Sequence, residues 1–329
     1  MRKRLIQLSI VLLVSLGVLA GCGSSGDGKE KVIIGYFPNI DHVPAMVAKE
    51  KEMYEKALGE DVVVEYKTFP DGGAFMTALK TGEIHGGLVG PGPAMNNYAS
   101  GADVKVIAGA SSGGTVIIAS KESGITSIDG LSGATFITPG IGCTHDVQME
   151  TFLKEFGLTS SRIGGTMQHV TGNPAQYGGM FETGRVQAAA VPEPWASVLS
   201  IEFDANILVD SNEISFGETL PNTIFVTSGK LINEKQELVE KLMEAHLQSV
   251  KFIEENPDES KEIAIKSIKE TTNHELSREI VDSAWERIRF TYEVDAEVIQ
   301  EFANSSFDLK FLKEKPDFAN FIDTSFLNR

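Results

Sequence analysis

The sequence is poor in cysteine and in basic residues. Only Cys22 and Cys143 occur among 329 residues, and two cysteines cannot form a disulfide framework. There are 29 Lys and Arg against 46 Asp and Glu, which gives a formal net charge of −17. Because nucleic-acid backbones are bound by basic surfaces, this balance excludes nucleic acid as a partner. No phosphate-binding loop or dinucleotide fingerprint is present, so we expect no cofactor.

What remains is a globular composition. Hydrophobic residues make up 42% of the chain and charged residues 23%, which excludes wholesale disorder. The length suggests about two domains, since a domain usually has roughly 100–200 residues.

The first 22 residues have the pattern of an export signal. Three basic residues, Arg2 to Arg4, precede an apolar stretch from Leu5 to Ala20. That stretch is shorter than the ~20 apolar residues of a spanning helix but fits a signal peptide, and no later stretch is long and apolar enough to span a membrane. The following Leu19-Ala20-Gly21-Cys22 resembles a bacterial lipobox.

We therefore predict a lipoprotein signal peptide at residues 1–21, acylation of Cys22 and a flexible tether at residues 22–30. Cleavage would leave 308 residues with a net charge of −20, because three basic residues are removed. An ordinary secretory signal or a short anchor helix is the alternative. From the lipobox we expect an exported protein on the extracytoplasmic face of the cell membrane, attached by lipid only.

From Lys31 onward, short apolar runs alternate with helical patterns, which predicts an α/β fold with parallel sheets. Everything after Leu231 is expected to be helical. The chain is expected to cross between two α/β lobes near Ile118–Lys121 and again near Leu220–Thr223. Lobe I would contain residues 31–119 and 221–329, lobe II residues 120–220, and the ligand would lie between them. The expected strands are 32–37, 62–66, 85–89, 104–108, 134–137, 164–170, 187–191 and 222–227.

Four loops rich in glycine and proline follow expected strands, at residues 38–44, 90–94, 139–146 and 171–174. In open parallel sheets, ligands bind beyond the carboxyl ends of the strands and against helix N-termini. Free backbone amides there can hold an anion without a basic side chain. Each such bond contributes roughly 1.5–3 kcal/mol, and micromolar binding needs about 8 kcal/mol. Four or five bonds would therefore be enough.

Several segments resemble the solute-binding proteins of ABC importers in the nitrate/sulfonate/taurine group, and the aliphatic sulfonate branch most of all. They are "GYFPNIDHVPAMVA", "GLVGPGPAMNNY", "VIAGASSGG", "GITSIDGLSGATFITPGIGCTHDVQMETFLKEFGL" and "AAAVPEPWASVL". The resemblance implies a type II periplasmic-binding-protein fold. It also implies a monomer that is not an enzyme, captures a small oxyanion-bearing solute such as an aliphatic sulfonate, and delivers it to an ABC permease and its ATPase.

The same resemblance assigns ligand-facing residues. Relatives often have Gly-Asn-Thr-Gln-Asp where this chain has Cys143 and His145 in place of Asn and Gln. Thr144 could instead be a helix N-cap with Asp146 in the first helical turn. Glu193 and Trp195 could be structural, and His246 lies on an apolar helical stripe and is expected to pack. The assigned residues are Asn39, His42, Gly90, Gly92, Ala94, Ser111, Ser112, Gly142, Thr144, His145, Asp146, Glu193 and Trp195.

Other ligands remain open. Nitrate, taurine or a phosphonate would use the same donors, and a thiamine-precursor pyrimidine could stack on Trp195, Tyr36, Phe37 or Tyr98. A metal receptor could use Asp41, His42, His145 and Glu193, although no HxH or HxxxH spacing supports it.

An enzyme using Cys143, His145 and Asp146 is disfavoured. These residues lie within four positions, and side chains two apart on a helix point away from each other.

Overall fold

The computed structural model describes residues 29–315, 317–318 and 320–327, and residues 31–329 form one compact unit. The predicted signal peptide, Cys22 and most of the tether lie outside the described residues. None of the described helices is long and apolar enough to cross a membrane.

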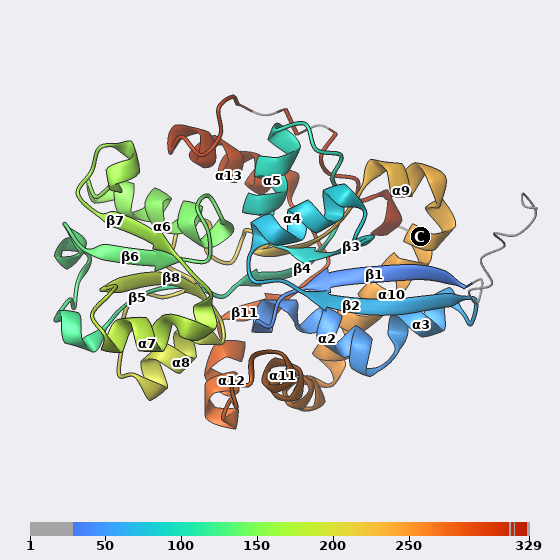
Figure 1. Ribbon diagram of the computed structural model, residues 1–329, viewed down its shortest axis with the longest axis horizontal. Coiled ribbons are helices and arrows are strands. Elements are labelled where there is room, and N and C mark those ends of the chain that lie inside the picture. Colours follow the sequence, from blue (N-terminus) through green and yellow to red (C-terminus); the bar gives the residue numbers. More distant parts are fainter. Residues whose placement is uncertain (1–28, 316, 319, 328–329) are drawn as a thin grey trace, which may run out of the picture. The chain divides into compact units, whose positions relative to one another are not determined.

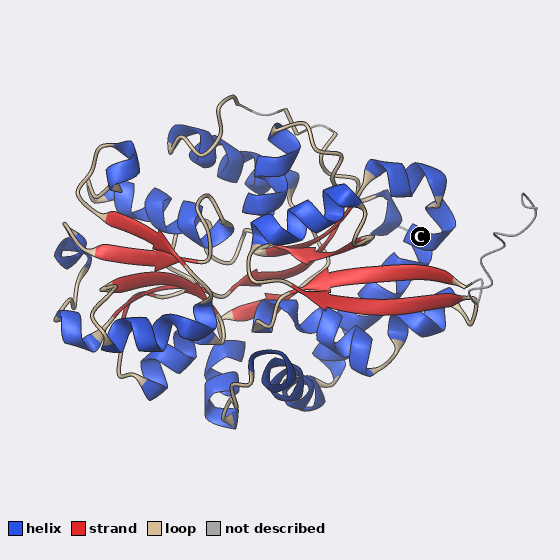
Figure 2. Ribbon diagram, viewed as in Figure 1, coloured by secondary structure: helices blue, strands red, loops and turns tan. Residues whose placement is uncertain are grey.

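Two mixed sheets form two lobes of this unit (Figure 1, Figure 2). The first sheet has the spatial order β11 (Ile288–Phe290), β4 (Lys105–Gly113), β10 (Thr223–Thr227), β3 (Gly86–Val89), β1 (Glu30–Tyr36) and β2 (Val62–Thr68). The second has the order β7 (Gln168–Thr171), β6 (Thr135–Thr138), β8 (Ala188–Pro192), β5 (Thr115–Ala119) and β9 (Asn206–Val209). The predicted α/β class and two-lobed fold are confirmed.

The sheets are not purely parallel, as the alternation had suggested. β1 pairs parallel with β3, but β10 runs antiparallel to both of its neighbours, β3 and β4. β5 likewise runs antiparallel to β8 and β9. These strands connect one sheet to the other, so they are not joined to their neighbours by the helical crossovers that produce parallel pairs.

The chain passes from the first sheet to the second at Gly114, earlier than the expected crossing near Ile118–Lys121. β5 belongs to the second sheet, so the first lobe does not extend to residue 119. Gly113 and Gly114 both have φ of +81°, a left-handed conformation that favours glycine. The bend coincides with the stretch Ser111-Ser112-Gly113-Gly114, a turn signal between two apolar runs that the expected crossing near Ile118–Lys121 did not use. The return crossing ends where β10 begins, at Thr223.

Helices cover both faces of the sheets (Figure 2). Two short helices follow β1, and Glu52 between them adopts a left-handed conformation with φ of 53°. β11 interrupts the expected all-helical C-terminal region. The α-helices are α2 (Val43–Glu50), α3 (Met53–Leu58), α4 (Gly72–Thr81), α5 (Pro91–Ala99), α6 (Thr144–Glu155), α7 (Tyr177–Glu182), α8 (Trp195–Glu202), α9 (Gly229–Glu234), α10 (Gln236–Glu255), α11 (Pro257–Thr272), α12 (Arg278–Trp285) and α13 (Ala296–Asp308).

The apolar core extends through both lobes. One cluster joins Ile34 and Phe225 of the first sheet to Ile118 and Ala189 of the second. A second cluster lies where α4, α5 and α13 pack on the first sheet, and a third lies under α6. His246 is fully buried, with Nε2 at 2.6 Å from the Gly109 carbonyl oxygen, as its position on the apolar stripe predicted.

Candidate functional site

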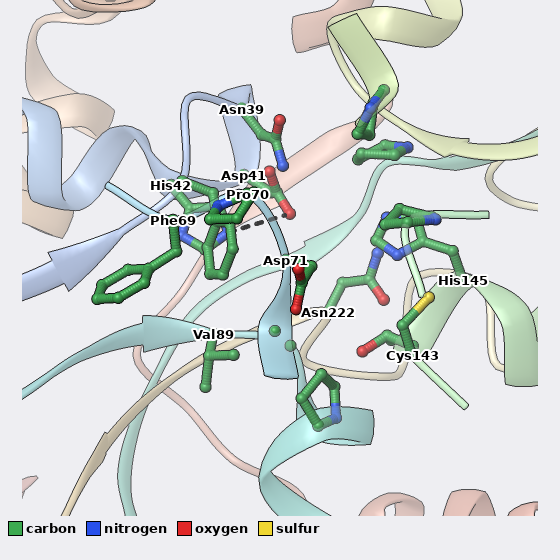
Figure 3. Close-up of a pocket in the computed structure, with 18 of the residues that line it drawn as sticks. Asn39, Asp41, His42, Phe69, Pro70, Asp71, Val89, Cys143, His145 and Asn222 are labelled. Carbon is green, nitrogen blue, oxygen red and sulfur yellow. Dashed lines mark ion pairs between the residues drawn. The ribbon is translucent and has the colours of Figure 1, made fainter. Parts of the chain in front are cut away.

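A cavity of about 70 Å³ lies where loops from the two sheets meet (Figure 3). This is room for several waters, since one water needs roughly 10–15 Å³ on this measure. Figure 3 shows Asn39, Asp41 and His42 on one side, and Cys143, His145 and Asn222 on the other. The wall consists of Phe37, Pro38, Asn39, Asp41, His42, Phe69, Pro70, Asp71, Gly72, Val89, Gly90, Pro93, Pro139, Cys143, Thr144, His145, Asn173, Pro174, Pro192 and Asn222.

The loops that build this wall follow β1, β2, β3, β6, β7 and β8, and one wall residue immediately precedes β10. The position is the one expected for ligands of open α/β sheets. No lysine or arginine lies on the wall, whereas Asp41 and Asp71 do. The site therefore has no fixed positive charge from a side chain.

Asp41 is a buried carboxyl group with one free oxygen. Its Oδ2 accepts a hydrogen bond from the Thr223 hydroxyl at 3.0 Å, and its carbonyl oxygen accepts one from the Ser111 hydroxyl at 2.9 Å. Its Oδ1 has no hydrogen-bond partner among the described residues. Burial raises the pKa of Asp41 to about 7, although the bond from Thr223 opposes the rise. Asp41 therefore changes charge near neutral pH.

The two histidines on the wall are neutral. Burial lowers the pKa of His145 to about 3, and burial together with the nearby His145 ring lowers the pKa of His42 to about 3. Nδ1 of His42 and Nε2 of His145 have no partner within the described part of the chain. A neutral imidazole carries one N–H donor and one acceptor, so each ring can offer a ligand either function.

Two amide side chains on the wall are oriented by their neighbours. Trp195 donates from Nε1 to Asn39 Oδ1 at 2.8 Å, which leaves the Asn39 amide nitrogen as the available donor. Asn222 donates from Nδ2 to the Gly113 carbonyl oxygen and to the Thr115 hydroxyl, both at 2.8 Å. These bonds leave Asn222 Oδ1 as a buried acceptor without a partner.

The N-termini of α5 and α6 face each other across the lobes. Gly92 donates its amide to Thr144 Oγ1 at 3.2 Å, and Asn96 donates to the Gly142 carbonyl oxygen at 2.9 Å. A Cβ on Gly92 would lie 2.7 Å from the Thr144 nitrogen, so only glycine permits this approach. Prolines at positions 91 and 93 have no N–H. The first turn of α5 thus binds α6 and has few amides left for a ligand.

This contact also corrects the role expected for Thr144. The N-cap of α6 is Cys143, and Thr144 is the first helical residue. The Thr144 hydroxyl binds the amide of α5 and does not cap its own helix. Asp146 accepts a hydrogen bond from the Gly142 amide at 2.7 Å, as an acidic residue in the first turn of a helix can.

The structure places only some of the predicted site residues on the wall. Glu193, which the sequence assigned to the ligand, has its carboxylate 3.0 Å from the Arg287 guanidinium. Trp195 is 2% exposed and reaches the wall only through Asn39. On the wall are Asn39, His42, Gly90, Thr144 and His145. Away from it are Gly92, Ala94, Ser111, Ser112, Gly142, Asp146, Glu193 and Trp195.

The sequence did not point to Asn222, Phe69 and Asp71 as site residues, and it offered Asp41 only for the alternative metal receptor. All four lie on the wall. The signal for Asn222 was available, because an amide between Pro221 and an apolar strand is a polar residue at a strand end. Asp71 caps α4, since it accepts a hydrogen bond from the Ala74 amide at 2.9 Å. Of the proposed stacking residues, only Phe37 lies on the wall.

The residues proposed for a metal receptor are not grouped at metal-ligand distances in the described part of the chain, whereas three other residues are. The proposed ligand set is divided, because the Glu193 carboxylate is bound to Arg287. Asp146, Glu150 and His169 lie within metal-ligand distances of each other, but the Arg162 guanidinium lies 3.1 Å from Glu150 and already supplies a positive charge. Burial raises the pKa of Cys143 to about 12, so its thiol stays protonated and is a poor nucleophile.

Comparisons with known proteins agree with this geometry. The model of the NMT1-like family matches residues 25–268. A Bacillus subtilis (strain 168) protein, provisionally named an aliphatic sulfonates-binding protein, is 25% identical over 336 residues, or 97% of this chain and 95% of its own.

Two solved structures show the same fold. The alkanesulfonate-binding protein SsuA from Xanthomonas axonopodis pv. citri, bound to MOPS, superposes with a TM-score of 0.76 at 20% identity over 89% of this chain and 98% of its own. SsuA from Escherichia coli gives 0.70 at 20% identity over 89% and 97%. The predicted type II periplasmic-binding fold is thereby confirmed. These relatives are binding proteins and not enzymes, and the chain belongs to the NMT1-like family of solute-binding proteins.

Proposed function

We propose that this protein is the extracytoplasmic solute-binding component of an ABC importer and that its cavity captures a small sulfonate. The observation that carries the proposal is the ring of neutral donors on the wall. Asn39 brings an N–H donor to this small cavity, and His42 and His145 each bring an unpartnered ring nitrogen that donates in one of the two neutral tautomers. The relatives named for alkanesulfonates, which match nearly the whole chain, support the same ligand class.

Such a wall suits a sulfonate physically. The charge of a sulfonate is spread over three oxygens, so hydrogen-bond donors can stabilise it without a paired cation. The N-terminus of α6 adds a positive dipole through Thr144 and His145, which both lie on the wall. Three or four bonds of roughly 1.5–3 kcal/mol each would give micromolar binding, less the cost of ordering the lobes.

Titration calorimetry of the purified protein tests this proposal. Alkanesulfonates should bind with one site per chain, whereas nitrate and phosphonates should bind more weakly. Absence of binding to every sulfonate would reject the sulfonate assignment. Small-angle scattering with and without the ligand should show a more compact, monomeric protein when it is bound, as closure of lobe II over lobe I around Gly113–Gly114 requires.

We also propose that the protein is anchored through an acylated Cys22 and delivers its solute to a membrane permease and its ATPase. The lipobox-like Leu19–Cys22 supports the anchor. Growth with labelled palmitate should label the wild-type protein and leave a Cys22→Ala variant unlabelled and released from the membrane fraction. Equal labelling of both would contradict the anchor.

A planar nitrogen heterocycle is the second candidate. Phe37 and Phe69 both line the cavity with ring centroids 6.4 Å apart, and the His42 ring lies 5.0 Å from Phe37. These faces could hold a ring. Quenching of Trp195, which is bonded to the wall residue Asn39, by a pyrimidine but not by sulfonates would favour this candidate.

A further inference from the structure

Two buried oxygens on the cavity wall lack a hydrogen-bond donor. They are Oδ1 of Asp41 and Oδ1 of Asn222, and neither has a partner among the described residues. The two residues are 3% and 1% exposed. Buried acceptors in folded proteins are nearly always paired, so a pair of unsatisfied ones at one cavity points to a missing donor.

Rotation of the Asn222 amide or the Asp41 carboxyl group would not give these oxygens a hydrogen-bond donor. Both hydrogens of the Asn222 amide are used, on the Gly113 carbonyl and on the Thr115 hydroxyl. A flip of the amide would break both bonds and place two acceptors against its oxygen. Asp41 is held through its other oxygen by the Thr223 hydroxyl. The positions of both acceptors are therefore fixed before a ligand arrives.

The free nitrogens of the wall, on Asn39, His42 and His145, form no hydrogen bond with either oxygen in the described part of the chain. The charged wall residues are both acidic, and the second one, Asp71, already accepts the Ala74 amide as a helix cap. The nearest basic group to Asp41 is His42, whose Nε2 is 3.8 Å from Oδ2, beyond hydrogen-bond distance. The other carboxylate near Asp41 is Glu193, which adds further negative charge.

We infer that Asp41 and Asn222 make the cavity selective for a solute that carries an N–H or ammonium donor. Asp41 is the residue that binds this donor group. The inference rests on the proposed function, in that this cavity is taken to be the solute site. A plain alkanesulfonate presents only acceptor oxygens and would leave both wall acceptors unsatisfied. An aminosulfonate or an amino-substituted nitrogen heterocycle would satisfy them.

Calorimetry at pH 7 with three sulfonates of nearly equal size tests whether a donor group on the solute strengthens binding. Ethanesulfonate has no donor, isethionate has a hydroxyl donor and taurine has an ammonium donor. We expect taurine to bind at least tenfold more tightly than ethanesulfonate, with isethionate between them. Equal or tighter binding of ethanesulfonate overturns the inference while leaving the sulfonate proposal in place.

A fourth probe, 4-aminopyrimidine, distinguishes failure of the sulfonate proposal from failure of the donor requirement. If none of the sulfonates binds but 4-aminopyrimidine does, the sulfonate proposal fails and the donor requirement is supported. If neither taurine nor 4-aminopyrimidine binds, the donor requirement is overturned.

The isosteric variant Asp41→Asn tests the residue itself. It should reduce the ratio of taurine to ethanesulfonate affinity to below about threefold, because an asparagine cannot ionise to pair with the ammonium group. Asp204→Asn is the matched control, since it removes the same charge from an exposed ion pair with Lys121. It should keep the wild-type ratio. An unchanged ratio in Asp41→Asn overturns the assignment to Asp41. Should Asp41→Asn fail to fold, as judged by circular dichroism, the wild-type ratios decide the inference alone.

Discussion

The buried Asp41 carboxyl predicts an unusual pH dependence of stability in the unliganded protein. Burial raises its pKa from the ordinary 3.8 to about 7 in the folded state. The folded protein therefore holds a proton on Asp41 between about pH 4 and pH 7 that the unfolded chain has released. Stability from this group is fully present below about pH 4 and is lost as the pH rises through 7.

The size of the effect follows from linkage. One proton of difference is worth 1.36 kcal/mol per pH unit, so about 3 kcal/mol is lost between pH 5 and pH 8. This is a large share of a typical unfolding free energy of ~5–15 kcal/mol. Asp41→Asn keeps the shape of the side chain but cannot ionise. Its stability relative to wild type should therefore rise by about 3 kcal/mol between pH 5 and pH 8.

Urea unfolding followed by circular dichroism at these two pH values measures the difference directly. Asp204→Asn serves as control, because Asp204 is exposed and its pKa is lowered by the hydrogen bond from Lys121, so it is ionised at both pH values. Its stability relative to wild type should not change with pH. If Asp41→Asn behaves like this control, Asp41 is not a proton-binding buried group and the reasoning is refuted.

Three further changes test the contacts around the site. Arg287→Met leaves two carboxylates without their partner, one of them fully buried, and should lower the free energy of unfolding by about 3–5 kcal/mol in urea. The exposed Arg278→Met should cost much less, because solvent screens its ion pairs, and equal losses would contradict this ranking. Thr144→Val removes the acceptor of the Gly92 amide and should cost about 1–3 kcal/mol, whereas Thr144→Ser should be near neutral in the same assay. Cys143, with its raised pKa and 8% exposure, should react with a disulfide reagent at pH 8 far more slowly in the native protein than in urea, and equal rates would show that the thiol is accessible.

Much of the fold could be predicted from the sequence because its signals are local. All eight expected strands overlap strands of the structure, since short apolar runs bounded by glycine and proline report burial directly. The Asp71 cap and the packing of His246 were local patterns too. β5, β9 and β11 were not predicted. Only Gly114 separates β5 from β4, and β11 has only three residues.

The candidate site was predictable only in part. The loops that follow the strands were found correctly, and Asn39, His42 and His145 do reach the wall. Glu193 looked like a ligand residue because it stands in a motif after a strand. It is bound instead by Arg287, which is 94 positions away in the chain. No spacing in the sequence reveals such a partner.

The sequence alone determined the fold class, the order of eight of the strands, the chain segments that supply the loops, and the shortage of basic residues in the chain as a whole. These are properties of short segments and of composition. The tertiary structure alone decided which polar atoms at the cavity already have hydrogen-bond partners within the protein. A hydrogen bond from Trp195 orients the Asn39 amide. Hydrogen bonds to Gly113 and Thr115 orient the Asn222 amide. Burial raises the pKa of Asp41, so it holds its proton near neutral pH. Hydrogen bonding and desolvation depend on distances between atoms that are far apart along the chain, and only folding sets those distances.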